Sequence, residues 1–156
     1  MTFDKFKKAI EIIPVNEAQK LRQLYINTFI NVDKEYYKKH IELRYNYSDG
    51  LCYTGYLWDC LKVVSVIDIE SIKETASMLN EVFVFWDVHT KENIFTEDYW
   101  KFGKEDVLRL DLELLIMNIQ YLPEDIYIFN GDLTWTLILT HEYVGGKRWC
   151  LKSGNI

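Results

Sequence analysis

Two short stretches carry the side chains best suited to acid–base or metal chemistry. Asp87 and His89 stand two residues apart in an apolar run that predicts a strand, so both side chains project from one face. His141 and Glu142 come at the end of the second strand of a predicted hairpin. If these strand ends meet, the four side chains could bind a metal ion or act as an acid–base group.

A plainer interpretation competes with this chemistry. The chain holds only three histidines, without tight metal-ligand spacing, so hydrogen-bonded histidines at a sheet edge are favoured for His89 and His141. The third, His40, lies among lysines and is expected to be solvated. Neither a Gly-x-Ser-x-Gly motif nor a phosphate-binding glycine loop occurs, and no metal or cofactor is expected. The acid–base enzyme therefore remains the alternative hypothesis.

The three cysteines are a second source of possible chemistry. Cys52, Cys60 and Cys150 cannot all pair within one chain, and reduced thiols are favoured over a Cys52–Cys60 or Cys60–Cys150 bridge. A nucleophilic thiol would require Cys60 or Cys150 beside His89 or His141. A buried, inert thiol is the favoured interpretation of Cys150, which is expected in a strand.

An aromatic cluster in a polar stretch indicates a different function, the binding of a protein. It consists of Tyr99, Trp100 and Phe102, and the carboxylates around it are Glu97, Asp98, Glu105 and Asp106. Aromatic anchors inside a polar rim are typical of protein interfaces. The competing interpretation is that the rings hold a loop against the core.

Length and composition restrict the remaining possibilities. The 156 residues are 49% hydrophobic, which predicts a single domain over 1–156 with one core. The longest apolar run is too short for a membrane span, and the N-terminal apolar stretch is too short for a secretory signal, so a cytoplasmic protein is expected. The net charge is −6, and the acidic residues dominate after residue 62. This balance disfavours nucleic acid and fits a basic protein partner.

Periodicity predicts the secondary structure in outline. Helical spacing of apolar residues predicts helices over residues 3–13, 16–32, 33–44 and 69–79. Asp68 is the expected N-cap of the last of these. Residues 82–89 predict a buried strand, and residues 53–61 favour a short helix over a strand. In residues 105–120 an alternation of leucines indicates a strand, but the length of the run favours a largely buried helix.

A hairpin is expected at Asn130-Gly131, a pair that tolerates the positive φ angles of a type I′ turn. A three-residue turn that includes Asp132 would group Tyr127 and Phe129 with Leu133 and Trp135. The favoured two-residue turn places Phe129 opposite Asp132. It also places six residues and His141 on the core face: Ile126, Ile128, Leu133, Trp135, Leu137 and Leu139. Gly145-Gly146 predicts a second turn, with residues 148–152 returning as a strand. The expected fold is α+β, with N-terminal helices packed on one face of a mainly antiparallel sheet that ends in a C-terminal hairpin meander.

Part of this hairpin also carries a resemblance. Its spaced residues are Tyr127-Ile-Phe129, Trp135-Thr136 and Thr140-His141-Glu142. The run resembles the C-terminal hairpin of small uncharacterised bacterial proteins, which are similar in size and acidity to immunity proteins that neutralise a toxin by binding it. The resemblance covers about twenty residues and implies no catalytic group. The favoured hypothesis is a non-enzymatic binding protein that meets its partner through the acidic residues of 92–113 and the aromatic residues 99–102.

Overall fold

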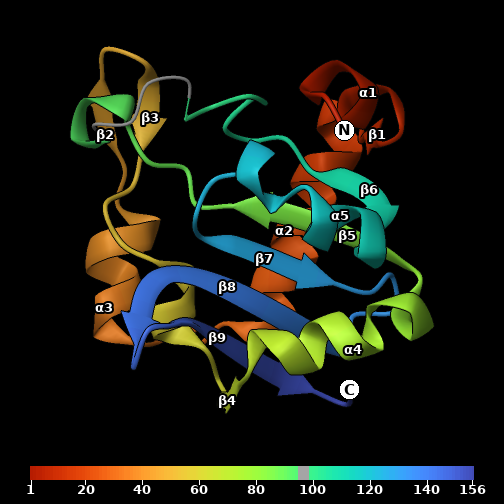
Figure 1. Ribbon diagram of the computed structural model, residues 1–156. Helices are drawn as coiled ribbons and strands as arrows, with labels where there is room; N and C mark the ends of the chain where they lie inside the picture. Colours follow the sequence, from red (N-terminus) through yellow and green to blue (C-terminus); the bar gives the residue numbers. More distant parts are fainter. Residues whose placement is uncertain (95–98) are drawn as a thin grey trace.

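The computed structural model describes residues 1–94 and 99–156 (Figure 1). In this part of the chain, seven strands form one antiparallel sheet in the order β1-β6-β5-β7-β8-β9-β4. Their bounds are β1 Glu11–Ile12, β4 Ser65–Ile67, β5 Glu81–Trp86, β6 Leu108–Asp111, β7 Ile126–Phe129, β8 Trp135–Val144 and β9 Lys147–Gly154. A separate hairpin is formed by β2 Tyr45–Tyr47 and β3 Gly50–Cys52. The expected α+β class and antiparallel sheet are confirmed.

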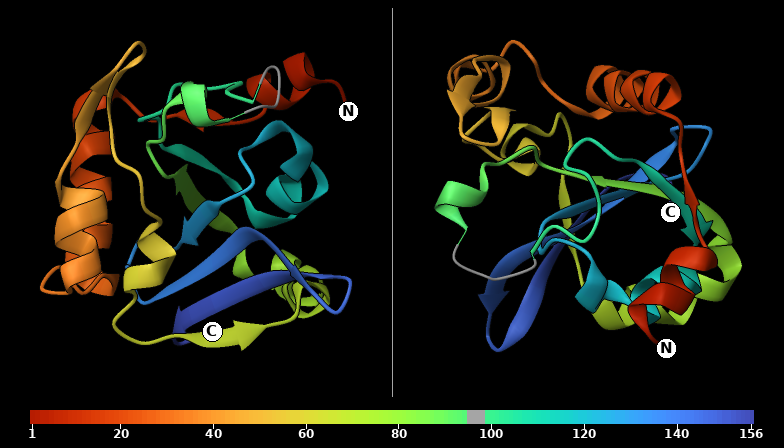
Figure 2. Two further views of the ribbon diagram at one scale, coloured as in Figure 1. Left: turned by 90° about the vertical axis from the view of Figure 1, so that its left-hand side faces the viewer. Right: turned by 90° about the horizontal axis from the view of Figure 1, so that it is seen from above.

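Helices cover both faces of the sheet, so the expectation of helices on one face is wrong (Figures 1 and 2). The helices are α1 Phe3–Lys8, α2 Val15–Phe29, α3 Glu35–Tyr37, α4 Ile69–Leu79 and α5 Leu112–Met117. Helices α1, α4 and α5 pack with Val84, Trp86 and Leu139 in a first core cluster. Helix α2 packs on the opposite face in a second cluster that includes Phe85 and Tyr127. Because both faces of the central strands are covered, these strands are apolar on both sides.

Short helical turns complete the described chain. They are the π-helical turn η1 Lys38–Glu42 and the 3₁₀ turns η2 Leu57–Cys60, η3 Lys91–Asn93 and η4 Ile119–Tyr121. The turn η2 agrees with the short helix expected within residues 53–61. None of the helices in the described residues is long and apolar enough to span a membrane.

Helices α4 and α1 differ in how well they match the bounds expected from the sequence. Helix α4 has the expected bounds, because the Asp68 carboxylate accepts a hydrogen bond of 2.9 Å from the Glu70 amide and caps it. Helix α1 ends at Lys8 instead of residue 13, because the chain turns there and β1 pairs with β6. The helix predicted over 3–13 is therefore wrong in its second half.

The long helix expected over residues 105–120 is also wrong. Its first part is strand β6, which lies between β1 and β5 and buries Leu108 and Leu110. Asp111 then takes an extended conformation as the N-cap residue of α5. The alternating leucines were the correct signal for β6. The length of the run wrongly favoured one long helix, because β6 and α5 follow each other without a loop.

The hairpin of β7 and β8 exists, but its turn differs from the expected one. Phe129 pairs with Thr136, four residues further along than Asp132. The Asn130 side chain accepts hydrogen bonds from the amides of Thr134 and Trp135 and so caps a wider loop. The positive φ of 56° belongs to Leu133, not to Asn130 or Gly131. Because the shift is even, Ile126, Ile128, Trp135, Leu137 and Leu139 keep their expected face, whereas Leu133 packs against the second cluster.

The turn with two positive φ angles lies at Gly145 and Gly146, with values of 60° and 79°. It joins β8 to β9, as expected from the sequence. A type I′ turn needs both central residues in this region, and glycine adopts it without steric cost.

Candidate functional site

A groove lies between the β2–β3 hairpin and residues 100–106. Its volume is about 730 Å³. The lining residues are Arg44, Asp49, Gly50, Leu51, Val88, Lys91, Trp100, Phe102, Gly103, Lys104, Glu105 and Asp106. Four of the residues that the sequence suggested for partner binding are therefore on one wall, namely Trp100, Phe102, Glu105 and Asp106. The opposite wall, from the hairpin, was not foreseen.

A half-buried arginine from α2 fixes the wall that carries Glu105. The Arg22 guanidinium donates to the carbonyl oxygens of Trp86, Lys104 and Glu105 at 3.1, 2.9 and 3.2 Å. It also lies 4.7 Å above the centre of the Phe85 ring. Burial lowers the pKa of Arg22, but the three carbonyl groups supply acceptors for the desolvated cation. The backbone at residues 104–105 is thereby tied to the end of β5.

An ion pair joins the two walls at the bottom of the groove. The Lys104 ammonium contacts the Asp49 carboxylate, and their side chains are only 17% and 10% exposed. Asp49 also accepts hydrogen bonds of 2.7 Å from the Thr90 hydroxyl and 2.9 Å from the Lys91 amide. Burial lowers the pKa of Lys104. Asp49 thus holds the turn of the β2–β3 hairpin against two other segments.

The aromatic residues of the other wall rest on the core. Phe102 is buried and its ring lies 5.5 Å from that of Phe3 and 6.1 Å from that of Trp86. Trp100 is half-buried against the first core cluster, and its indole N–H has no acceptor within the described ranges. The Tyr99 hydroxyl accepts a hydrogen bond of 3.0 Å from the Glu124 amide. This arrangement corresponds to the competing interpretation, in which the rings hold the loop, although Trp100 and Phe102 also line the groove.

The charges that line the groove are of both signs, whereas the sequence suggested carboxylates alone. Glu105 pairs with Arg44 at 3.4 Å, and the Asp106 carboxylate accepts a hydrogen bond of 2.7 Å from the Gly103 amide. Glu97 and Asp98 lie outside the described residues. The hairpin adds one apolar side chain to the groove, Leu51 on β3, which is 60% exposed.

The residues suggested for acid–base chemistry converge only in part. The Tyr56 ring lies between two histidines, with its centre 4.8 Å from that of His89 and 5.2 Å from that of His141. His89 Nε2 is 2.6 Å from the Gly55 carbonyl oxygen, which agrees with a histidine bonded to backbone. The strand that precedes it, β5, lies inside the sheet and not at its edge. Glu142 is exposed, and the described contacts include none between its carboxylate and these side chains.

Asp87 is buried and fully used by the fold. Its carboxylate accepts hydrogen bonds from the hydroxyls of Tyr53 and Tyr127 at 2.8 and 2.6 Å, and from the Leu57 amide at 3.1 Å. Burial raises the pKa of Asp87 to about 6, while the charge of His89 and the three donors act in the opposite direction. The carboxylate therefore anchors the start of η2 on the sheet.

The His141 side chain contacts a carboxylate that the sequence did not suggest. Its Nδ1 lies 3.0 Å from both carboxylate oxygens of Asp125, which also accepts a hydrogen bond from the Trp58 indole at 3.1 Å. A pairing of this kind orients an imidazole. Asp125 directly precedes β7, and the pairing of β7 with β8 brings it near the residues that follow Leu139. The correct register of the β7–β8 hairpin would have predicted that Asp125 lies near His141.

The orientation of His141 also differs from the expected one. Its ring packs against Tyr56 and Trp58, and Trp58 in turn packs against the second core cluster. Trp135 and Leu139 belong to the first cluster, on the opposite face. A register shift between β8 and β9 follows Leu139 and breaks the alternation of side chains. The expectation that His141 points to the face of Trp135 is therefore wrong.

Neither metal nor thiol chemistry gains support from this geometry. Within residues 1–94 and 99–156, no group of three or more His, Cys, Asp or Glu side chains is placed to hold a metal ion. The three cysteines are free and buried. Burial raises the pKa of both Cys60 and Cys150 to about 11, which disfavours the thiolate that a nucleophile requires.

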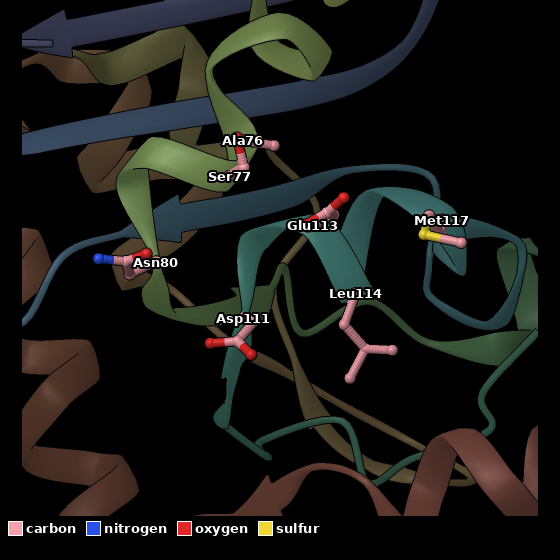
Figure 3. Close-up of a pocket in the computed structure, with 7 residues that line it drawn as sticks. All are labelled: Ala76, Ser77, Asn80, Asp111, Glu113, Leu114 and Met117. Atoms are coloured by element: carbon pink, nitrogen blue, oxygen red, sulfur yellow. The ribbon is translucent and has the colours of Figure 1, made fainter.

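A smaller hollow of about 330 Å³ lies between α4 and α5 (Figure 3). Its carboxylates come from Asp111 and Glu113, and its apolar side chains include Leu114 and Met117. Asp111 is the N-cap residue of α5 but its side chain makes no capping hydrogen bond, and Glu113 lies in the first turn of α5. The β2–β3 groove is larger and holds the residues suggested by the sequence, so it is the stronger candidate. Comparisons of the chain with protein-family models, curated proteins and solved structures find no significant match.

Proposed function

We propose that the chain is a non-enzymatic protein-binding domain, of an immunity-like kind, that holds a segment of its partner in the β2–β3 groove. The observation that carries this proposal is the groove itself. Trp100, Phe102, Glu105 and Asp106 were selected from the sequence as interface residues, and all four line it.

The character of the groove suits a segment of protein. Leu51 and Trp100 offer apolar surface, and the lining also includes three cations and three carboxylates. Small-molecule sites are more enclosed and carry fewer polar groups. A peptide segment with side chains of mixed charge could pair with Arg44 and Glu105 at the rim, where charged contacts mainly set specificity and the rate of association.

The acid–base alternative has less support. The oxygens of Asp87 are occupied by two tyrosines and an amide. In the described residues the exposed Glu142 carboxylate has no hydrogen bond to either His89 or His141. The Asp125–His141 pair is the remaining reactive arrangement, and its carboxylate is shared with Trp58. These contacts fit the role of a structural support for η2 and β8.

The candidate partners are the proteins encoded by the neighbouring genes in the source genome. Binding of each one to the native chain and to Leu51→Glu tests the proposal. We expect one product to bind the native chain and Leu51→Glu to weaken this binding at least tenfold, a loss of about 1.4 kcal/mol. The side chain is exposed, so the fold should be unaffected. Titration calorimetry measures the affinity, and growth rescue on co-expression reports neutralisation of a toxic partner.

Met78→Glu is the matched control, because Met78 is also exposed and lies on α4, away from the groove. It should bind like the native chain. If no neighbouring product binds, or if Leu51→Glu and Met78→Glu behave alike, the proposal is wrong.

A further inference from the structure

Another hollow lies between α2 and η1 and contains two arginines. Its volume is about 320 Å³, which is within the range of small-ligand sites. Arg22 lines it from α2, and Arg44 lines it from the position before β2. The α2–η1 hollow adjoins the β2–β3 groove, because Arg44 and Glu105 line both.

The Arg22 guanidinium has N–H groups that the fold does not use. Its Nε and Nη2 donate to the carbonyl oxygens of Glu105, Trp86 and Lys104, and these three bonds occupy all the N–H groups of those two nitrogens. Nη1 carries two more N–H groups, for which the described residues supply no acceptor. Nη1 is not one of the enclosed polar atoms that lack a partner, so solvent reaches it. An acceptor from outside the chain can therefore approach Nη1 through the hollow.

Arg22 also lacks a counter-ion in direct contact. Its three acceptors are uncharged carbonyl groups, and it takes part in none of the ion pairs between described residues. Burial lowers the pKa of Arg22, and the charges of Glu105 and Asp87 oppose this only through space. A carboxylate at Nη1 would form charge-assisted hydrogen bonds, which are about twice as strong as those between uncharged groups.

The remaining lining favours a ligand with an apolar body. Ile41 and Leu57 are buried, and Ile26 and Tyr37 are half-buried. They come from four different elements, α2, α3, η1 and η2, so the apolar surface is a product of the fold. A few polar groups among apolar side chains are typical of small-molecule sites.

Two carboxylates of the chain limit the charge of the ligand. Glu42 lines the hollow from η1, and Glu105 pairs with Arg44 at 3.4 Å. One carboxylate of a ligand can be held at Nη1 of Arg22, but a second negative charge would be repelled by Glu42 and Glu105. We propose that the α2–η1 hollow binds a monocarboxylic acid with a small apolar body, whose carboxylate accepts hydrogen bonds from Arg22 Nη1.

Benzoate is the probe for this site, and benzamide is its uncharged counterpart of the same shape. In amide NMR spectra of the native chain, benzoate should shift the signals of residues 19–26 and 41–44 in a saturable way, with a Kd of about 1 mM. Benzamide should bind about tenfold more weakly, because it lacks the charge. Isophthalate, which has a second carboxylate, should also bind more weakly than benzoate.

Three variants test the electrostatic basis of binding. Gln19→Glu places a carboxylate of equal size at the hollow and should weaken benzoate binding about tenfold. Lys20→Gln changes the charge of α2 by the same amount outside the hollow, so it should bind like the native chain. Glu105→Gln removes the carboxylate that pairs with Arg44 and should strengthen binding about threefold. Gln19, Lys20 and Glu105 are exposed, and thermal unfolding verifies that each variant is folded.

This test does not involve a protein partner, so its result is independent of the function proposed for the groove. Several outcomes would overturn the carboxylate site. They are a native chain that benzoate does not shift at residues 19–26 and 41–44, equal affinities for benzoate and benzamide, and equal effects of Gln19→Glu and Lys20→Gln. Weaker binding to folded Glu105→Gln would also contradict it.

Discussion

Replacement of Asp87 by alanine is expected to lower the free energy of unfolding by about 4 kcal/mol, because it leaves buried donors without acceptors. The donors are the Tyr53 and Tyr127 hydroxyls and the Leu57 amide. The start of η2 loses its anchor on the sheet at the same time. Urea denaturation followed by tryptophan fluorescence measures the loss, and a change below about 1 kcal/mol would contradict this role.

The conservative variant Asp87→Asn separates the charge from the hydrogen bonds. Because the folded state raises the pKa of Asp87 to about 6, the native chain takes up a proton on folding between about pH 4 and 6. The stability that results from this proton uptake is present in full below about pH 4 and is lost as the pH rises through 6. Asp87→Asn should remove that component of the pH dependence while keeping most of the stability. A pH profile of the urea midpoint identical to that of the native chain would argue against it.

Replacement of Arg22 by methionine should have the second large effect, a loss of about 3 kcal/mol in the free energy of unfolding. Methionine fills a similar volume but leaves the carbonyl groups of Trp86, Lys104 and Glu105 without their donor. The segment at residues 104–105 should then detach from β5, and binding of a partner in the groove should weaken as well. Urea denaturation and calorimetry measure the two effects.

Arg22→Lys serves as the control for charge. Lysine keeps the cation but cannot donate to three carbonyls with the planar geometry of a guanidinium. We expect it to recover only part of the stability lost in Arg22→Met. Full recovery would show that charge alone matters at this position, and an unchanged groove affinity in Arg22→Met would show that the 104–105 backbone is held by other contacts.

The sequence predicted those elements that local signals define. Asp68 and the apolar spacing after it define α4, and the apolar run at residues 82–86 defines β5. Strands β2, β3 and β4 were missed because each has three residues, too few for a period to be visible. At Asn130-Gly131 the local turn preference was overridden, since the Asn130 side chain caps a wider loop that lets β8 pair with β7 in another register.

Only one wall of the candidate site could be predicted from the sequence. The wall formed by residues 100–106 is continuous in sequence, and its aromatic and acidic composition was visible directly. The other wall comes from Arg44, Asp49 and Leu51, and long-range contacts bring it into place, above all the Asp49–Lys104 ion pair. Asp125 could not be paired with His141 before the register of β7 and β8 was known.

Hydrogen–deuterium exchange on the complex with the partner tests the role of the groove most directly. Amide exchange in residues 44–51 and 100–106 should slow by about tenfold or more when the partner binds, while exchange in α4 stays unchanged. Protection confined to the Tyr56–His141 cluster or to the α4–α5 hollow, with residues 44–51 and 100–106 unaffected, would contradict a binding function for the groove.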